Sequence, residues 1–430
     1  MNTGLIFICI GIVCITAVFF SGCLGQNPEH PPGQNLTPNE VPANPGAEKA
    51  VVDANTRFAL KLYSALCTDP RNANTSLFFS PFSISSALAV TYEGARGITA
   101  EQIQSVFLFP EDSNQRREGF EQLSTDISRG NSRYVLKTAD ALWAEKTYPF
   151  LPGFIQNAQR YYHANATNLD FETQPETSRV TINKWVEDQT DARIRDLIPA
   201  GGIDPLTRLV ITNAVYFKGS WVEPFEKNQT RDDIFTVAPG KTVPVRMMVR
   251  DDADALFGYT ETDTLQVLEM PYATDTRNQL SMLILLPKAT ALTAVEKSLT
   301  VQNLSALRGA LITQRVKVAF PRFQLETRYS LPETLASMGM PAAFSDQADF
   351  SGMDGTKSLS VGDVIHKAFI EVNEEGTEAA AATAVVEKAM ASAHEPPTPV
   401  FNADHPFIFL IQDRESGNIL FMGRVDNPGG

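Results

Sequence analysis

The sequence predicts an α+β fold, because long apolar runs typical of strands occur together with helical segments. Residues 207–217 form an apolar run that suits a strand buried on both faces, and residues 267–272 and 280–287 indicate a further strand pair. Residues 58–66 are amphipathic, and Asp53 and Asn55 offer N-caps for a first helix through Leu66. With 430 residues, 43% of them hydrophobic, the chain can bury a large core.

The N-terminal 50 residues differ from the rest of the chain. Residues 1–22 predict a signal peptide, since the apolar run 5–20 leads to Ser21, Gly22 and Cys23. Small residues before a Cys resemble a prokaryotic lipobox, so we expect Cys23 to carry lipid after cleavage. The alternative is an uncleaved membrane helix, since the first four residues lack Lys and Arg. Either way we expect an extracytoplasmic protein, secreted or anchored to the outer face of the cell membrane.

Residues 23–50 predict a tether, because they are rich in Pro, Asn and Gly and cannot bury a core. The folded body is expected to span residues 51–430. In chain order, its predicted elements include a short strand at 76–79, a helix with Pro81 in its first turn, and strands around 139–143 and 168–171 that flank a helix. A helix starts near 182 and ends near Pro199.

Residues 371–392 are rich in small side chains and contain one Gly and no Pro. Ala, Glu, Lys and Met favour a helix here, whereas Thr383, Val385 and Val386 favour a strand. Pro396, Pro397 and others follow and end any regular structure. Taken alone, the segment could be a surface helix, a linker or a segment that changes conformation.

Residues 374–382 resemble the proximal hinge of the reactive-centre loop of the serpins. Other stretches match the same family in the same order, namely 76–90, 93–99, 207–221, 318–323, 335–340, 348–353 and a closing hairpin formed by 404–410 and 419–425. The resemblance therefore covers about residues 51–428. It implies a serpin fold of three β-sheets with about eight or nine helices and an exposed reactive-centre loop at about 374–400. It also implies inhibition of serine proteinases by suicide, in which the cleaved loop inserts into the central sheet.

The hinge that the resemblance identifies is composed of residues able to enter a sheet. Gly376 can absorb a large dihedral change and Thr377 is small and β-branched. No Pro or large charged side chain interrupts the following alanines, so no ladder hydrogen bond is lost and no charge is buried. The hinge residues are Glu374, Gly376, Thr377, Ala379, Ala380, Ala381 and Ala382.

The resemblance also implies two polar sites in the central sheet. The first, called the shutter, lies where strands must part, and consists of Ser80, Ser83, Asn213 and His366. The second, called the breach, lies at the top of the sheet where the loop first enters, and consists of Trp221, Arg322 and Glu374. We expect Arg322 to pair with Glu374 as an exposed ion pair worth up to ~1 kcal/mol.

Counting from Gly376 as the family does places the reactive bond between Met390 and Ala391. Met390 suits a serine proteinase with an apolar primary pocket, such as an elastase-, chymotrypsin- or subtilisin-like enzyme. Lys388 is the rival and would suit a trypsin-like enzyme. The segment after the bond is about three residues longer than in antitrypsin-like serpins, which leaves both open.

Several other functions lack support. The net charge of −14 argues against nucleic acid as a partner. The chain has no His-Glu-x-x-His motif, no paired Cys in the body, where only Cys67 remains, and no Gly-x-Ser-x-Gly elbow. We therefore expect no metal, no cofactor and no enzymatic activity. We also expect the protein to be a monomer. The alternative function is that of a non-inhibitory serpin acting as a binding or chaperone module, which a bulky or proline-containing hinge would have favoured.

Overall fold

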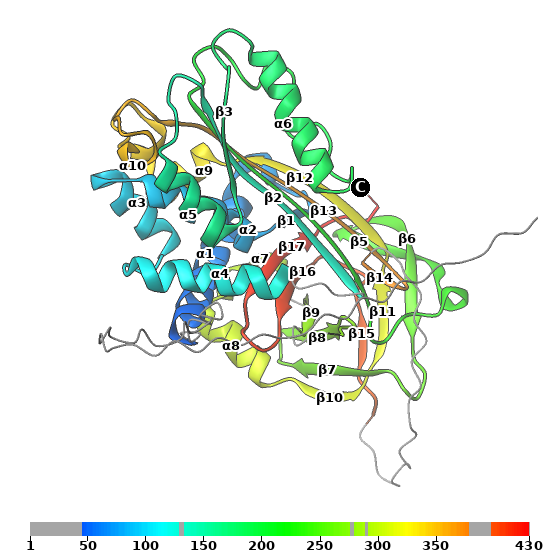
Figure 1. Ribbon diagram of the computed structural model, residues 1–430. Helices are drawn as coiled ribbons and strands as arrows, with labels where there is room; N and C mark the ends of the chain where they lie inside the picture. The colour runs from blue at the N-terminus through cyan, green and yellow to red at the C-terminus, as the bar shows by residue number, and fades with distance from the viewer. Residues whose placement is uncertain (1–44, 129–132, 276–278, 289–290, 378–396, 430) are drawn as a thin grey trace, which may run out of the picture. The chain divides into compact units, whose positions relative to one another are not determined.

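The computed structural model describes residues 45–128, 133–275, 279–288, 291–377 and 397–429, which form ten α-helices and seventeen strands in three sheets (Figure 1). The three-sheet α+β fold expected from the sequence is confirmed. The helices are α1 (Pro45–Thr68), α2 (Pro81–Gly94), α3 (Gly97–Phe107), α4 (Ser113–Ser128), α5 (Pro152–Tyr162), α6 (Pro175–Gln189), α7 (Leu292–Ser298), α8 (Val301–Gly309), α9 (Pro332–Met338) and α10 (Ser351–Asp354).

A six-stranded sheet contains four of the predicted site residues, namely Asn213, His366, Gly376 and Thr377. Its strand order is β12-β13-β14-β4-β2-β3. The strands are β12 (Phe323–Ser330), β13 (Val361–Asn373), β14 (Gly376–Thr377), β4 (Leu209–Ser220), β2 (Tyr134–Glu145) and β3 (Asn165–Leu169). Strands β13 and β4 are parallel to each other over most of their length, and the short β14 lies between them at one end.

Two further sheets complete the body. A seven-stranded sheet has the order β1-β17-β16-β9-β8-β7-β10, and a four-stranded sheet has the order β15-β11-β6-β5. The seven strands are β1 (Leu77–Phe79), β17 (Ile419–Val425), β16 (Phe407–Asp413), β9 (Leu280–Pro287), β8 (Leu265–Pro271), β7 (Leu256–Glu261) and β10 (Ile312–Arg315). The four are β15 (Val400–Asn402), β11 (Lys317–Pro321), β6 (Lys241–Arg250) and β5 (Arg231–Ala238). The predicted closing hairpin is confirmed as β16 and β17.

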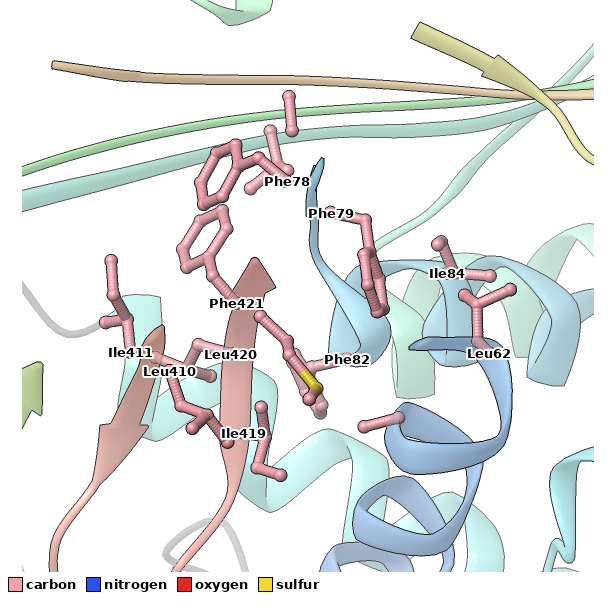
Figure 2. Close-up of a cluster of buried hydrophobic side chains, with 14 of the residues drawn as sticks. Leu62, Phe78, Phe79, Phe82, Ile84, Leu410, Ile411, Ile419, Leu420 and Phe421 are labelled. Atoms are coloured by element: carbon pink, nitrogen blue, oxygen red, sulfur yellow. The ribbon is translucent and has the colours of Figure 1, made fainter. Parts of the chain in front are cut away.

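The main hydrophobic core joins α1 and α2 to the seven-stranded sheet. Figure 2 shows Phe78 and Phe421 side by side, and their ring centroids are 5.2 Å apart. Leu62 of α1 and Ile84 of α2 belong to the same buried cluster. This packing fixes the start of α2, and with it the position of Ser80 and Ser83, against the back of the six-stranded sheet.

A second, smaller cluster lies on the other face of the six-stranded sheet, beneath α6. In Figure 1, α6 lies on the opposite side of β2 and β13 from β16 and β17. Ile182 and Val186 of α6 are fully buried in this cluster. The sheet contributes Ala139, Ala141 and Trp143 from β2, Val210 and Ala214 from β4, and Ile365 from β13. The cluster therefore spans the junction between β4 and β13.

The first helix begins earlier than the sequence predicts. α1 starts at Pro45, and Ala47 is fully buried, so the folded body begins before Val51. Asn55 is not an N-cap but a buried side chain that donates to Asn418 Oδ1 at 2.7 Å. The capping preference of Asn misled the prediction because its amide serves a tertiary contact. Within the described residues, no helix has the length and apolarity needed to cross a membrane.

Candidate functional site

Two residues of the hinge, Gly376 and Thr377, are already part of the six-stranded sheet in the uncleaved chain. Strands β4 and β13 pair directly from Leu209–Val361 to Tyr216–Phe369, and beyond that point β14 separates them. Thr377 pairs with Val372 on one side and with Gly219 on the other, both antiparallel. The sequence predicts insertion of Thr377 after cleavage, whereas the structure has Gly376 and Thr377 inserted beforehand.

Gly376 is required at its position for two reasons. Its φ is +145°, a region that L side chains rarely adopt. A Cβ on this residue would also lie 2.0 Å from the carbonyl oxygen of Gly219, which is closer than any real contact. The glycine therefore allows β14 to approach β4 closely enough to pair with it.

Thr377 is fully buried beneath aromatic side chains at this end of the sheet. Its Oγ1 lies 2.8 Å from the hydroxyl of Tyr272, and the Tyr272 ring stacks on Trp221 with centroids 4.5 Å apart. The indole Nε1 of Trp221 donates to the carbonyl oxygen of Asn373 at 3.1 Å. Trp221 of the breach therefore holds both the end of β13 and the pocket that receives Thr377.

Glu374 links the hinge to the neighbouring sheet. Arg322 Nε donates to Glu374 Oε1 at 2.7 Å, and Thr230 Oγ1 donates to the same oxygen. Burial alone would raise the pKa of Glu374, but these hydrogen bonds lower it below its usual value. The expectation of an exposed ion pair is wrong: Glu374 is only 2% exposed, although the Arg322 side chain remains 40% exposed. The turn between β13 and β14 is fixed to the segment that follows β4: the N–H of Trp221 donates to the carbonyl oxygen of Glu375 at 2.9 Å, and the N–H of Phe225 donates to that of Glu374 at 2.8 Å.

The predicted shutter residues meet at a second place, where the start of α2 packs behind the sheet. Asn213 Nδ2 donates to Ser83 Oγ at 2.5 Å, and Asn213 Oδ1 contacts His366 Nδ1. The backbone N–H of Ser80 donates to His366 Nε2 at 3.0 Å. Burial lowers the pKa of His366 to about 3, so its imidazole is neutral. All four residues are nearly or fully buried.

The sequence analysis missed one member of this cluster. Asp140 of β2 stands opposite Asn213 of β4, and its Oδ1 accepts from Asn213 Nδ2 and from Ser83 Oγ. Burial raises the pKa of Asp140 to about 7, although both hydrogen bonds oppose this shift. Strand alternation was the available signal, because Ala139, Ala141 and Trp143 share one face and Asp140 therefore faces α2.

Comparisons with known proteins now identify the family. Residues 53–428 match the family model described as serpin (serine protease inhibitor). The chain is a serpin. It is 42% identical to an uncharacterized serpin-like protein of Thermococcus kodakarensis, over 97% of this chain and 98% of that protein. It is 44% identical to the leukocyte elastase inhibitor of Bos taurus, over 87% of this chain and 98% of that protein.

A solved structure agrees with this assignment. The crystal structure of Serpin48 from the insect Tenebrio molitor matches with a TM-score of 0.77 at 31% identity, covering 88% of this serpin and 98% of that chain. Membership of this family supports a general role in proteinase inhibition and not in catalysis.

The structure places only part of the predicted loop. It brings Glu374, Gly376 and Thr377 to the breach beside Trp221 and Arg322. The other hinge residues, the reactive bond with its rival and the lipidation site lie outside the described residues: Ala379, Ala380, Ala381, Ala382, Lys388, Met390, Ala391 and Cys23. Within the described residues, no group of three or more His, Cys, Asp and Glu could hold a metal ion.

Proposed function

We propose that this serpin inhibits serine proteinases as a suicide substrate. The serine Oγ of the proteinase attacks the carbonyl carbon of Met390, an ester forms, and the Met390–Ala391 amide bond breaks with the proton passing to the amine of Ala391. The loop beyond Thr377 then inserts between β4 and β13 and carries the acyl-enzyme with it. The supporting observation is that β14 already pairs with both strands at the end where insertion must begin.

The strand pattern favours insertion energetically. At present β4 and β13 share one parallel ladder, with His366 opposite Asn213 near its middle. A strand inserted between them would be antiparallel to both, as β14 is, so one parallel ladder is exchanged for two antiparallel ones. With ~1 kcal/mol net for each added hydrogen bond, complete insertion would release on the order of 10 kcal/mol.

Insertion also moves the trapped enzyme far from its starting position. About fourteen residues at ~3.3 Å each span roughly 45 Å. That displacement separates the ester from its original surroundings, and the released energy is large enough to distort the active site before the ester is hydrolysed. No cofactor takes part in these steps.

We propose an apolar-pocket proteinase as the target, because Met390 occupies the counted position. The leukocyte elastase inhibitors among the relatives are consistent with this class of enzyme. Lys388 remains the rival residue and would direct the serpin to trypsin-like enzymes. We also propose that lipid on Cys23 holds the serpin at the outer face of the cell membrane, with the proline-rich segment as its tether.

The test is incubation with an elastase-like, a subtilisin-like and a trypsin-like enzyme, followed by denaturing electrophoresis. A covalent complex that survives denaturation with the first two is expected. Cleavage without complex formation by all three enzymes would contradict the proposal and favour a binding or chaperone role.

A further inference from the structure

A groove of about 530 Å³ lies between α1, α4 and the turn that joins β16 to β17. The two helices meet there, and Gln122 Nε2 of α4 donates to Glu48 Oε2 of α1 at 2.9 Å. Three buried apolar side chains line the groove, namely Val52, Leu123 and Leu280. The groove shares no lining residue with the breach or the shutter, so it is a separate feature of the serpin.

The lining of this groove is strongly acidic. Among its described residues, five carboxyl side chains stand against one cationic side chain, Lys49, which pairs with Asp53 at 2.6 Å. The five carboxyl side chains are those of Glu48, Asp53, Asp126, Asp413 and Glu415. A concave surface lined by one sign of charge focuses the electric field and concentrates ions of the opposite sign. The groove is therefore suited to a cationic ligand.

The position of these carboxylates is unfavourable for the fold alone. The pKa of Glu48 is raised, first by its burial and then by the neighbouring carboxylates of Asp126, Asp413 and Glu415. Asp126 also lies in the last turn of α4, where the partial negative charge of the helix end disfavours an acid and where α4 has no basic residue. A bound cation relieves this repulsion, which favours binding.

A buried amide in the groove points to a ligand independently of the charges. Asn418 lines the groove and is 1% exposed, and its Nδ2 has no hydrogen-bond partner among the described residues. Its Oδ1 accepts at 2.7 Å from Asn55, a buried residue outside the groove lining, so the nitrogen is the arm of the amide on the groove side. An unsatisfied buried donor destabilises the fold unless an acceptor approaches it.

We propose that this groove binds a basic peptide segment of a partner protein. Arginine or lysine side chains of the segment pair with the carboxylates and lay their apolar stems against Val52, Leu123 and Leu280. A backbone carbonyl oxygen of the same segment accepts from Asn418 Nδ2. A peptide combines cations with acceptors, whereas a protonated polyamine offers donors only, so the Asn418 amide favours the peptide.

Two other occupants fit the groove less well. A single metal ion is disfavoured because the carboxylates are dispersed: in the part of the chain that the structure describes, no group of three or more His, Cys, Asp and Glu could hold one. Residues 1–44 of this chain immediately precede α1, but they contain Glu29 and Glu40 and no Lys or Arg. Their charge does not complement the groove.

Fluorescence anisotropy with the full uncleaved chain tests the proposal. The probe is a labelled peptide of alternating Arg and Ala, and the control probe has Glu in place of each Arg. The Arg peptide is expected to bind at about 0.01 M salt and to bind more weakly at about 0.15 M, whereas the Glu peptide is not expected to bind. Glu48→Gln and Glu415→Gln should each weaken binding about two- to fivefold. The matched control Glu101→Gln removes an exposed carboxylate of α3 and should leave the affinity unchanged.

Asn418→Asp tests the part of the proposal that concerns the peptide backbone. It keeps the oxygen that Asn55 needs, removes the N–H donor and adds a negative charge. The affinity for the Arg peptide should fall despite that added charge, and an unchanged or higher affinity would overturn the assignment to a peptide. If Asn418→Asp does not fold, spermidine decides, because binding of spermidine as tight as that of the peptide would equally overturn it. Equal affinities of the wild type and the Glu48→Gln, Glu415→Gln double variant would overturn the site itself.

Discussion

The Tyr272 hydroxyl lies 2.8 Å from Thr377 Oγ1, so the first inserted side chain is hydrogen-bonded before any proteinase arrives. Tyr272 directly follows β8 of the seven-stranded sheet, whereas Thr377 belongs to the six-stranded sheet. The hinge is therefore held by a residue outside the sheet that it enters.

Replacing Thr377 with Arg should convert the serpin from inhibitor to substrate. An unpaired charge buried between β4 and β13 costs several kcal/mol, and insertion slows accordingly. Each ~1.4 kcal/mol on that step gives hydrolysis of the ester about tenfold more advantage. The ratio of cleaved serpin to covalent complex measures the effect on a denaturing gel. Thr377→Ser, which keeps the hydroxyl, is the matched control and should stay close to wild type; an unchanged ratio for Thr377→Arg would refute the role of this position.

Cleavage of the loop should raise the midpoint of thermal unfolding substantially. The reason is that the inserted segment adds a second antiparallel ladder to β4 and to β13 in place of their mutual parallel one. Scanning calorimetry of intact and nicked protein at the same pH provides the comparison. Equal midpoints would mean that the loop stays outside the sheet, and would favour the non-inhibitory alternative.

Met390→Arg should shift inhibition towards trypsin-like enzymes, since the carboxylate in their primary pocket pairs with Arg and not with Met. If Lys388 is the true site, the wild type already inhibits such enzymes and the substitution changes little. Mass analysis of the peptide released on complex formation distinguishes the two. A new amino terminus at Ala391 supports Met390, and one at Ala389 supports Lys388.

Glu374→Gln should loosen the hinge at neutral pH. The carboxylate accepts from Arg322 and Thr230 while only 2% exposed, so loss of its charge weakens charge-assisted bonds worth about 1–3 kcal/mol. Because the pKa of Glu374 is lowered in the folded chain, its contribution is present above the ordinary glutamate value of ~4.3 and is lost as pH falls through the lowered value. The unfolding free energies of wild type and variant should therefore differ at about pH 7 and converge in acid. A constant difference across pH would show that the charge of Glu374 is irrelevant.

The polar residues of the sheet could be predicted from the sequence because their spacing along the chain matches a family pattern. Ser80, Ser83, Asn213 and His366 do meet. Arg322 bonds Glu374, and Trp221 bonds the preceding residue, Asn373. What could not be predicted was the register between strands. Asp140 lies within a segment predicted as a strand, yet only its place opposite Asn213 gives it a role.

The sequence also could not predict how much of the hinge is inserted in the uncleaved chain. Small side chains make Gly376 and Thr377 suitable for a strand, but whether they occupy one depends on competition between the sheet and solvent. Here the buried Thr377–Tyr272 contact and the bonds of Glu374 decide in favour of the sheet. Likewise, the Asn55 side chain, suited to a helix cap, serves a contact with Asn418 that lies far away in the chain.

The small hydrophobic cluster beneath α6 has a consequence for how long the uncleaved chain persists. Ile365 of β13 is packed in the same cluster as Val210 and Ala214 of β4, and Ile182 of α6 covers them. Widening of the gap between these strands must first separate those side chains, and the cost is incurred before any new ladder forms. Under the proposed mechanism, the uncleaved fold would survive because its conversion is slow and not because it is the most stable arrangement. The lifetime of the uncleaved fold would then depend on how fast the contacts with α6 open. Substitutions in α6 would shorten that lifetime without any change in the loop.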